Sequence, residues 1–141
     1  MKTVRRREFL RSAGLGAAAV AATGPFIASG WAANPPSDRI NVAVMGIRSR
    51  GRAHMESFAT LPNVEVSVLC DVDERLFPEA VADLEKSSGK KARTVVDVRK
   101  VLEDKTVDVL SIASPNYWHA LAAIWACQAG KDVYLEKPTC H

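Results

Sequence analysis

Residues 39–51 read RINVAVMGIRSRG, and this stretch decides the fold class. It begins with a short run of apolar and β-branched residues and turns at Gly46. A central parallel strand has this composition because both of its faces are buried. Glycines at Gly46 and Gly51 suit a tight turn from a strand into a helix. We therefore predict a strand over 39–46 and a helix over 51–61.

The rest of the chain repeats this alternation of strand and helix. Further strands are predicted at 64–70, 93–96, 107–114 and 132–136, and further helices at 74–87, 98–104 and 115–129. Helical spacing groups apolar residues on one side of the second helix and of the last one, namely Leu76, Ala80, Val81 and Leu84, and Leu121, Ile124 and Trp125 with Gln128. Such spacing is typical of βαβ units. We predict an α/β fold, a doubly wound parallel sheet of the Rossmann type, over 39–141, after a linker at 34–38.

Composition narrows the class of protein. The chain has 141 residues, 48% of them hydrophobic and 25% charged, which suits one soluble globular domain and excludes a fibrous or disordered chain. The length is too short for a complete two-domain enzyme. The net charge of +3 is uneven, because residues 1–33 hold five basic residues and one acidic residue. The remainder is close to neutral, so a nucleic-acid-binding surface is not expected.

Residues 1–33 are interpreted as an export signal. A basic start is followed by a mild apolar run, and no charged residue occurs over 12–37. The segment RRREFLR over 5–11 resembles the twin-arginine signal, with Arg6 and Arg7 as its pair and Arg5 where Ser or Thr is usual. An ordinary secretory signal or an uncleaved anchor is the alternative. The twin-arginine interpretation implies folding before export, the twin-arginine machinery as partner, and a periplasmic location.

The cysteines agree with folding in a reducing compartment. Cys70, Cys127 and Cys140 are odd in number and form no C-x-x-C pair, so we interpret them as structural thiols. Cys140 and His141 are adjacent potential metal ligands, but two ligands without others do not make a site. We therefore predict no metal centre.

The first turn carries part of a dinucleotide fingerprint. Such a loop needs one glycine for the turn, one for close approach of the pyrophosphate and one for helix packing. Gly46 and Gly51 supply the first and third, and Arg48 stands at the second. The Arg48 side chain must swing aside, or its charge can contact a phosphate. A plain turn between strand and helix is the alternative.

Asp71 follows the second predicted strand directly, 20 residues after Gly51. A carboxylate here can accept hydrogen bonds from the ribose hydroxyls and repels a 2′-phosphate. Asp71 therefore favours NAD over NADP, with NADP still possible. Asp73 and Glu74 are close competitors for this role, and a solvated loop carboxylate is the alternative.

Two motifs follow the last two strands. SPNYWH over 114–119 leaves the fourth strand, and Glu136-Lys137-Pro138 leaves the fifth. Ligands of open α/β sheets bind beyond the carboxyl ends of the strands. Lys137 can donate a hydrogen bond or proton to a substrate oxygen there. Alternatively, Lys137 is a surface residue and the histidine of the first motif merely begins a helix.

Together these motifs resemble the Gfo/Idh/MocA oxidoreductase family, over residues 40–141. The resemblance implies that Gly46 and Gly51 hold the pyrophosphate and Asp71 the ribose. It implies a nicotinamide side formed by the residues of the two late motifs, namely Ser114, Pro115, Asn116 and Glu136. Lys137 would serve the reaction centre, with Pro138 after a cis bond, and His119 would orient the loop. Arg48 departs from the usual glycine.

By the same resemblance, the chain is the cofactor half of an NAD(P)-dependent oxidoreductase of sugars, polyols or their derivatives. The family has a second α/β domain that supplies substrate contacts and usually the homo-oligomer interface, so we expect a truncated product. An NAD-dependent glycoside hydrolase of this fold and a non-catalytic nucleotide-binding fragment are the alternatives. Another Rossmann enzyme, such as a methyltransferase, gives no reason for Glu136-Lys137-Pro138.

Overall fold

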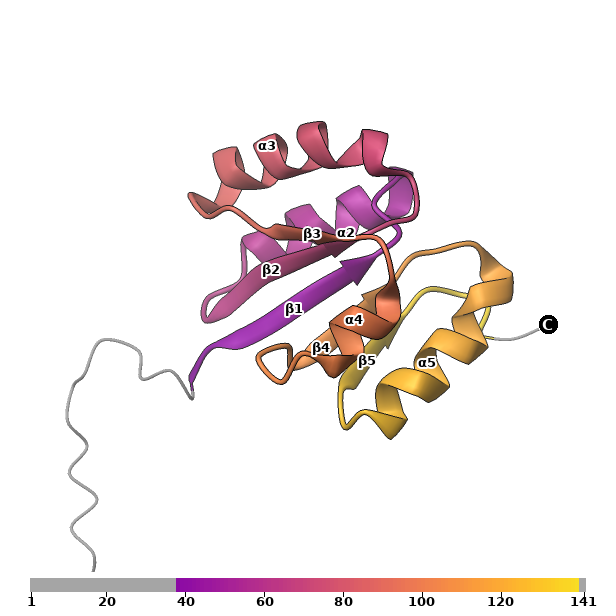
Figure 1. The fold of residues 1–141 in the computed structure, drawn as a ribbon. Coiled ribbons are helices and arrows are strands. Elements are labelled where there is room, and N and C mark those ends of the chain that lie inside the picture. Colours follow the sequence, from indigo (N-terminus) through magenta and orange to yellow (C-terminus); the bar gives the residue numbers. More distant parts are fainter. Residues whose placement is uncertain (1–37, 140–141) are drawn as a thin grey trace, which may run out of the picture. The chain divides into compact units, whose positions relative to one another are not determined.

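The computed structural model describes residues 38–139 (Figure 1). The predicted export signal, nearly all of the predicted linker, Cys140 and His141 lie outside the described residues.

A five-stranded parallel sheet forms the centre of the fold. Its strands are β1 (Ile40–Met45), β2 (Val64–Cys70), β3 (Arg93–Val95), β4 (Val109–Ile112) and β5 (Asp132–Leu135). Their order across the sheet is β3-β2-β1-β4-β5, and every neighbouring pair is parallel. The doubly wound Rossmann-type sheet predicted from the sequence is therefore confirmed.

Helices cover both faces of this sheet (Figure 1). They are α2 (Ser49–Ala59), α3 (Phe77–Ser88), α4 (Val98–Glu103) and α5 (His119–Gln128). Side chains of β1 separate the two layers: Val42 and Val44 pack in the apolar cluster with α2 and α3, and Ala43 packs in the cluster with α4 and α5. Burial on both faces explains the nearly continuous apolar run of the first strand.

Two predicted helices begin later than expected, each after a short 3₁₀ turn. The turn η2 (Glu74–Leu76) precedes α3, and η3 (Asn116–Trp118) precedes α5. Asp73 caps η2 by accepting a hydrogen bond from the backbone N–H of Arg75. In both cases a proline lies near the boundary, where its missing N–H removes no helical hydrogen bond.

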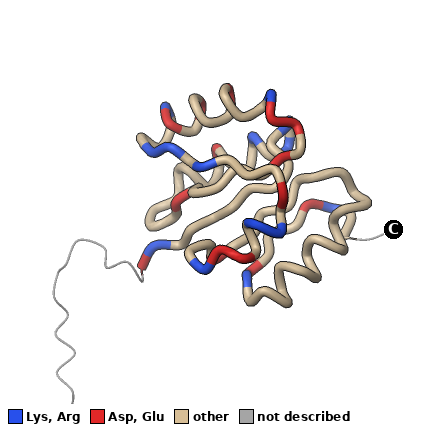
Figure 2. The backbone as a smooth tube through the Cα atoms, in the orientation of Figure 1, with Lys and Arg blue, Asp and Glu red and all other residues tan. Residues whose placement is uncertain are grey.

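The buried side of α5 is not the side on which helical spacing places the predicted apolar group. His119, Ala122 and Ala126 face the core, whereas Leu121 and Ile124 are 40% and 54% exposed. No charged residue occurs along this helix (Figure 2). A helix that is apolar all round carries no periodic signal, and its small alanines allow the closest approach to the sheet. Among residues 38–139, none of the helices combines the length and apolar character needed to span a bilayer.

This assignment of α5 makes a stability prediction. Ala122→Leu should lower the free energy of unfolding by about 1–3 kcal/mol, because extra bulk enters a filled core. Leu121→Ala should cost less than about 1 kcal/mol, because that side chain is half-exposed. Urea unfolding followed by circular dichroism measures both. If Leu121→Ala lost more unfolding free energy than Ala122→Leu, then Leu121 and not Ala122 would face the core.

Candidate functional site

The loops after β1 and β4 meet at the point where the strand order reverses. Gly46 has φ of 83°, and a Cβ atom on it would lie 2.7 Å from the backbone nitrogen of Ser114. A Cβ atom on Gly51 would lie 1.7 Å from the carbonyl oxygen of Gly46. Both predicted glycines are therefore required by close backbone contacts, and they leave a narrow cradle at the start of α2.

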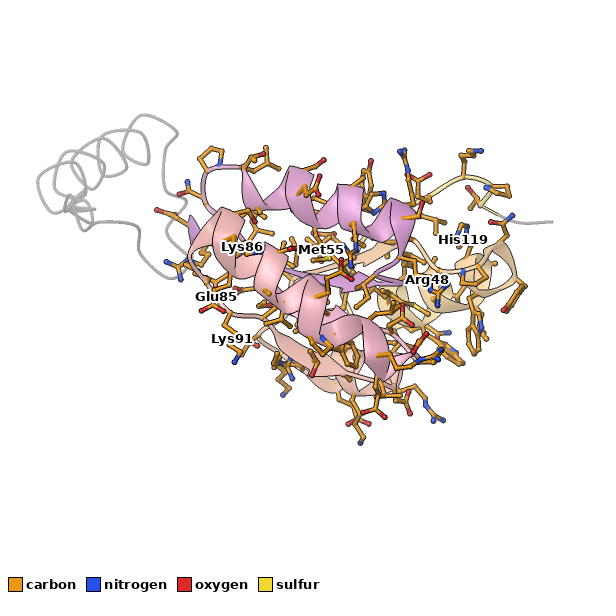
Figure 3. All side chains as sticks on the ribbon, turned by 90° about the horizontal axis from the view of Figure 1, so that it is seen from above. Arg48, Met55, Glu85, Lys86, Lys91 and His119 are labelled. Carbon is orange, nitrogen blue, oxygen red and sulfur yellow. The ribbon has the colours of Figure 1, made fainter. Side chains whose placement is uncertain are left out.

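Arg48, at the second position of the fingerprint, lies outside this crowding. Its φ of −79° and ψ of 173° suit any residue, and it precedes α2 without forming a side-chain cap. The side chain is 72% exposed and reaches Asp73, with 3.1 Å between Nη2 and Oδ2. Arg48 thus swings aside, one of the two expected outcomes, at the end of the molecule that also carries His119 (Figure 3). Because Arg48 forms no side-chain cap, the backbone N–H groups at the start of α2 can face an anion.

Asp71 holds the first turn as well as facing a cavity. Its Oδ2 accepts a hydrogen bond of 2.9 Å from the N–H of Ile47, and its Oδ1 accepts one of 2.9 Å from the N–H of Asp73. The competing carboxylate of Asp73 is bound by Arg75 and Arg48, and these hydrogen bonds hold its pKa well below the usual range. Asp71 lines the cavity and the two competitors do not.

This first cavity has a volume of about 350 Å³ and lies beyond the carboxyl ends of β1, β2 and β4. Besides Asp71 it has mostly apolar walls, and these include Val72, Val96, Val98, Tyr117 and Trp118. Pro115 also lines it. The carboxylate of Asp97 lines the cavity too, and Arg99 binds it at 2.6 Å between Nη2 and Oδ2. Apolar and aromatic walls beside carboxylates suit a flat heterocycle attached to a sugar with free hydroxyls.

A second depression, of about 460 Å³, lies on the other side of the Gly46 contact. Its lining gathers most residues of the two late motifs, namely Ser114, Asn116, His119, Glu136 and Lys137, together with Arg50 and Ala113. Ser114 lines both hollows, and its hydroxyl is buried without a hydrogen-bond partner among the described residues. A buried hydroxyl at the junction of two hollows is suited to bind a ligand that spans them.

His119 joins the two late motifs. Its Nδ1 lies 2.7 Å from the carbonyl oxygen of Pro138, and its Nε2 lies 2.8 Å from that of Ser114. The side chain is fully buried, so it orients the loops instead of meeting a substrate. The peptide bond between Lys137 and Pro138 is cis, as the family resemblance implies. Lys137 itself is exposed in the depression.

Sequence reasoning missed the partners of Glu136. Its Oε1 lies 2.6 Å from Nε of Arg50 and 2.9 Å from Nε2 of His54, and these two contacts lower the pKa of the carboxyl to about 2. His54 Nδ1 lies 2.9 Å from the hydroxyl of Ser111. The available clue was spacing, because a residue three positions after Gly51 shares the helix side that packs on the sheet.

Ser111, His54 and Glu136 have the order of a hydrolytic triad, but Ser111 is fully buried on β4 and no substrate can reach it.

Burial also raises the pKa of the Cys70 thiol to about 12, which leaves it protonated and poorly reactive. Among residues 38–139, no three potential ligands gather in a geometry that binds a metal ion.

Curated relatives of the chain include glycosidases. The chain is 27% identical to a glycosyl hydrolase family 109 protein of Shewanella baltica, over 98% of this chain and 34% of that protein. It is also 27% identical to an alpha-N-acetylgalactosaminidase of Shewanella oneidensis, with the same coverage. The chain thus spans about a third of the length of these relatives.

Similar solved structures include dehydrogenases. The myo-inositol dehydrogenase of Lactobacillus casei, in complex with NAD(H) and myo-inositol, matches with a TM-score of 0.62 and 25% identity, over 72% of this chain and 29% of that one. A levoglucosan dehydrogenase bound to NADH matches with a TM-score of 0.64 and 29% identity, over 72% of this chain and 28% of that one.

The family assignment rests on a match over most of the chain. Residues 40–141 match the oxidoreductase family with an NAD-binding Rossmann fold. This match begins at β1 and takes in the glycine cradle, Asp71 and both late motifs. The chain therefore belongs to the Gfo/Idh/MocA oxidoreductase family, through its NAD-binding Rossmann domain.

Proposed function

We propose that this chain is the cofactor-binding part of an NAD-dependent oxidoreductase that acts on a sugar, a polyol or a derivative of one. The observation that carries the proposal is the cradle at Gly46 and Gly51, where a Cβ atom on either glycine would collide with backbone. Backbone packed this closely, beside the start of a helix, suits a pyrophosphate. The orphaned hydroxyl of Ser114 also fits a ligand that spans both hollows.

Each hollow suits one end of the dinucleotide. Asp71 would accept hydrogen bonds from the adenosine ribose in the apolar cavity. The nicotinamide end would occupy the polar depression, beside Asn116 and Glu136. Bound NAD supplies a carbon that accepts a hydride from the substrate and returns it in the reverse reaction.

Lys137 is the residue that we assign to acid–base chemistry. It is exposed in the polar depression, and no hydrogen bond of its side chain is found within residues 38–139. The neutral amine can accept the proton of the substrate hydroxyl as hydride leaves the neighbouring carbon, and the resulting ammonium group returns that proton in the reverse reaction. The dehydrogenase neighbours, one solved with myo-inositol, support a carbohydrate-like substrate.

A second candidate function is NAD-dependent glycoside hydrolysis, which the glycosidase relatives favour. Such an enzyme oxidises the sugar transiently, eliminates the leaving group, adds water and returns the hydride. It therefore shows no net reduction of NAD over many turnovers, whereas a dehydrogenase does.

The cofactor preference can be tested at Asp71. We expect the chain to bind NADH more tightly than NADPH, and Asp71→Asn to narrow that difference by about tenfold, since a charge that repels the 2′-phosphate is removed. Isothermal titration calorimetry with each reduced cofactor measures both affinities.

Asp108→Asn is the matched control for this test. Asp108 also accepts a hydrogen bond from a backbone N–H, at 2.8 Å from Asn41, but it precedes β4 at the amino ends of the strands. This variant should leave the preference unchanged. Tighter binding of NADPH by the unmutated chain would contradict the proposed role of Asp71.

The two candidate reactions can be separated by turnover. Assayed as the longest product of its reading frame, the protein should form NADH from NAD with at least one member of a panel of sugars and polyols. Residues 1–141 by themselves should show no such turnover, because the depression at Lys137 is open and substrate positioning is worth about 7–11 kcal/mol of the barrier. Cleavage of nitrophenyl glycosides without net NADH formation would favour the hydrolase.

We also propose that the protein is exported to the periplasm by the twin-arginine machinery. The support is the segment over 5–11, in which Arg6 and Arg7 precede Phe9, Leu10 and Arg11. Export after folding would let the protein carry its cofactor out of the cytoplasm.

Replacing both Arg6 and Arg7 with lysine tests this route. A twin-arginine signal does not tolerate that change, so the variant should remain in the cytoplasmic fraction, whereas a general secretory signal accepts lysine. Cell fractionation and immunoblotting measure the distribution. Periplasmic accumulation of the double variant at the unmutated level would refute the assignment.

A further inference from the structure

The segment Glu136-Lys137-Pro138 is held from both faces of the sheet. From α2, His54 contacts the Glu136 carboxylate at 2.9 Å. From α5, His119 contacts the Pro138 carbonyl at 2.7 Å. Lys137 lies between these anchors and is itself exposed. The position of its backbone therefore depends on both contacts.

We propose that His54 is a positioning residue, which fixes Glu136 and thereby sets the backbone position of Lys137 in the polar depression. The part played by Lys137 rests on the proposed function. The mechanical role of His54 rests on its own contacts.

The Glu136 carboxylate requires a hydrogen on Nε2 of the imidazole. An ionised carboxylate can only accept, so Nε2 of His54 must donate to Glu136. Nδ1 can then accept the hydroxyl hydrogen of Ser111, at 2.9 Å. One neutral tautomer satisfies both bonds, and it connects the centre of β4 to the residue that follows β5.

The imidazole ring is also enclosed by aromatic side chains. His54 is 5% exposed and contacts two aromatic rings edge-on, Phe58 at 6.5 Å and Tyr134 at 5.1 Å between ring centroids. Phe58 and Tyr134 contact each other at 5.6 Å. This aromatic cluster encloses the ring, and its two hydrogen bonds direct it toward Glu136.

Arg50 is the other partner of Glu136, but it is a weaker constraint. Its side chain is 66% exposed, against 6% for His54 and 13% for Glu136. Exposed ion pairs are screened by water and contribute little, whereas a buried hydrogen bond to a charge is strong. The hydrogen bond from His54 is also the largest cause of the lowered pKa of Glu136, ahead of that from Arg50.

The test compares His54→Leu, His54→Gln and Phe58→Leu in the full chain. Carbon-detected NMR follows the titration of the Glu136 carboxyl, and amide spectra follow the backbone at Lys137. In the unmutated chain the carboxyl should stay ionised down to about pH 2. His54→Leu should move its pKa toward the ordinary value of 4.5 and shift the Lys137 amide. It should also weaken NADH binding severalfold.

His54→Gln should restore most of the Glu136 titration, because its amide nitrogen can donate where Nε2 did. Phe58→Leu is the control for packing, since it disturbs the aromatic cluster and leaves both hydrogen bonds of His54 in place. Its Glu136 titration should match the unmutated chain. If His54→Leu does not fold, Ser111→Ala takes its place, and it should raise the pKa of Glu136 by a smaller amount.

The proposal is overturned if His54→Leu leaves both the Glu136 titration and the Lys137 amide unchanged, or if Phe58→Leu alters them equally. A lack of rescue by His54→Gln counts against it as well. Failure of the unmutated chain to bind NADH would reject the proposed function, and the Glu136 titration would still decide the role of His54.

Discussion

The close approach of Gly46 to the loop after β4 is the constraint on which the site depends. A Cβ atom on Gly46 would lie 2.7 Å from the Ser114 nitrogen, and the φ of 83° also disfavours a side chain, so only glycine fits this position. Gly51 then lets α2 begin directly against the Gly46 carbonyl. Because these contacts bring the ends of β1 and β4 together, the hollows on either side share one wall, and Ser114 lies on it. A side chain at either glycine would separate the loops and with them the two hollows.

Around this contact, charged side chains serve mainly to hold loops. Asp71 binds the N–H groups of Ile47 and Asp73, and Glu136 is bound by Arg50 and His54. These carboxylates fix the first turn and the end of β5 before any ligand arrives. Sites held in advance lose less conformational entropy when a ligand binds. Lys137 is different, because its side chain is exposed and forms no hydrogen bond with another described residue. Its amino group therefore remains free for the proposed contact with a substrate.

The sequence predicts the parts of this arrangement that depend on local chemistry. The structure agrees with three of these predictions: the strand before Gly46, the alternation of strands and helices, and the position of both late motifs at one edge of the sheet. The missed features depend on tertiary contacts. The buried side of α5 is set by how closely alanines approach the sheet, and no polar face marks it. The link from His54 to Glu136 joins residues 82 positions apart, and neither residue alone indicates a partner.

The same cofactor domain is compatible with dehydrogenase and glycosidase chemistry for a physical reason. In both proposed reactions a hydride first leaves a sugar carbon and a proton leaves its hydroxyl, and a cofactor cradle beside one lysine amine that can accept this proton would serve that step in either case. They diverge afterwards, when the oxidised sugar is either released or loses its leaving group. This chain spans about a third of the length of the glycosidase relatives, and the shared step needs only the cofactor domain that it contains. Similarity to both classes therefore agrees with a shared first step, in which the proposed role of Lys137 is to transfer the proton.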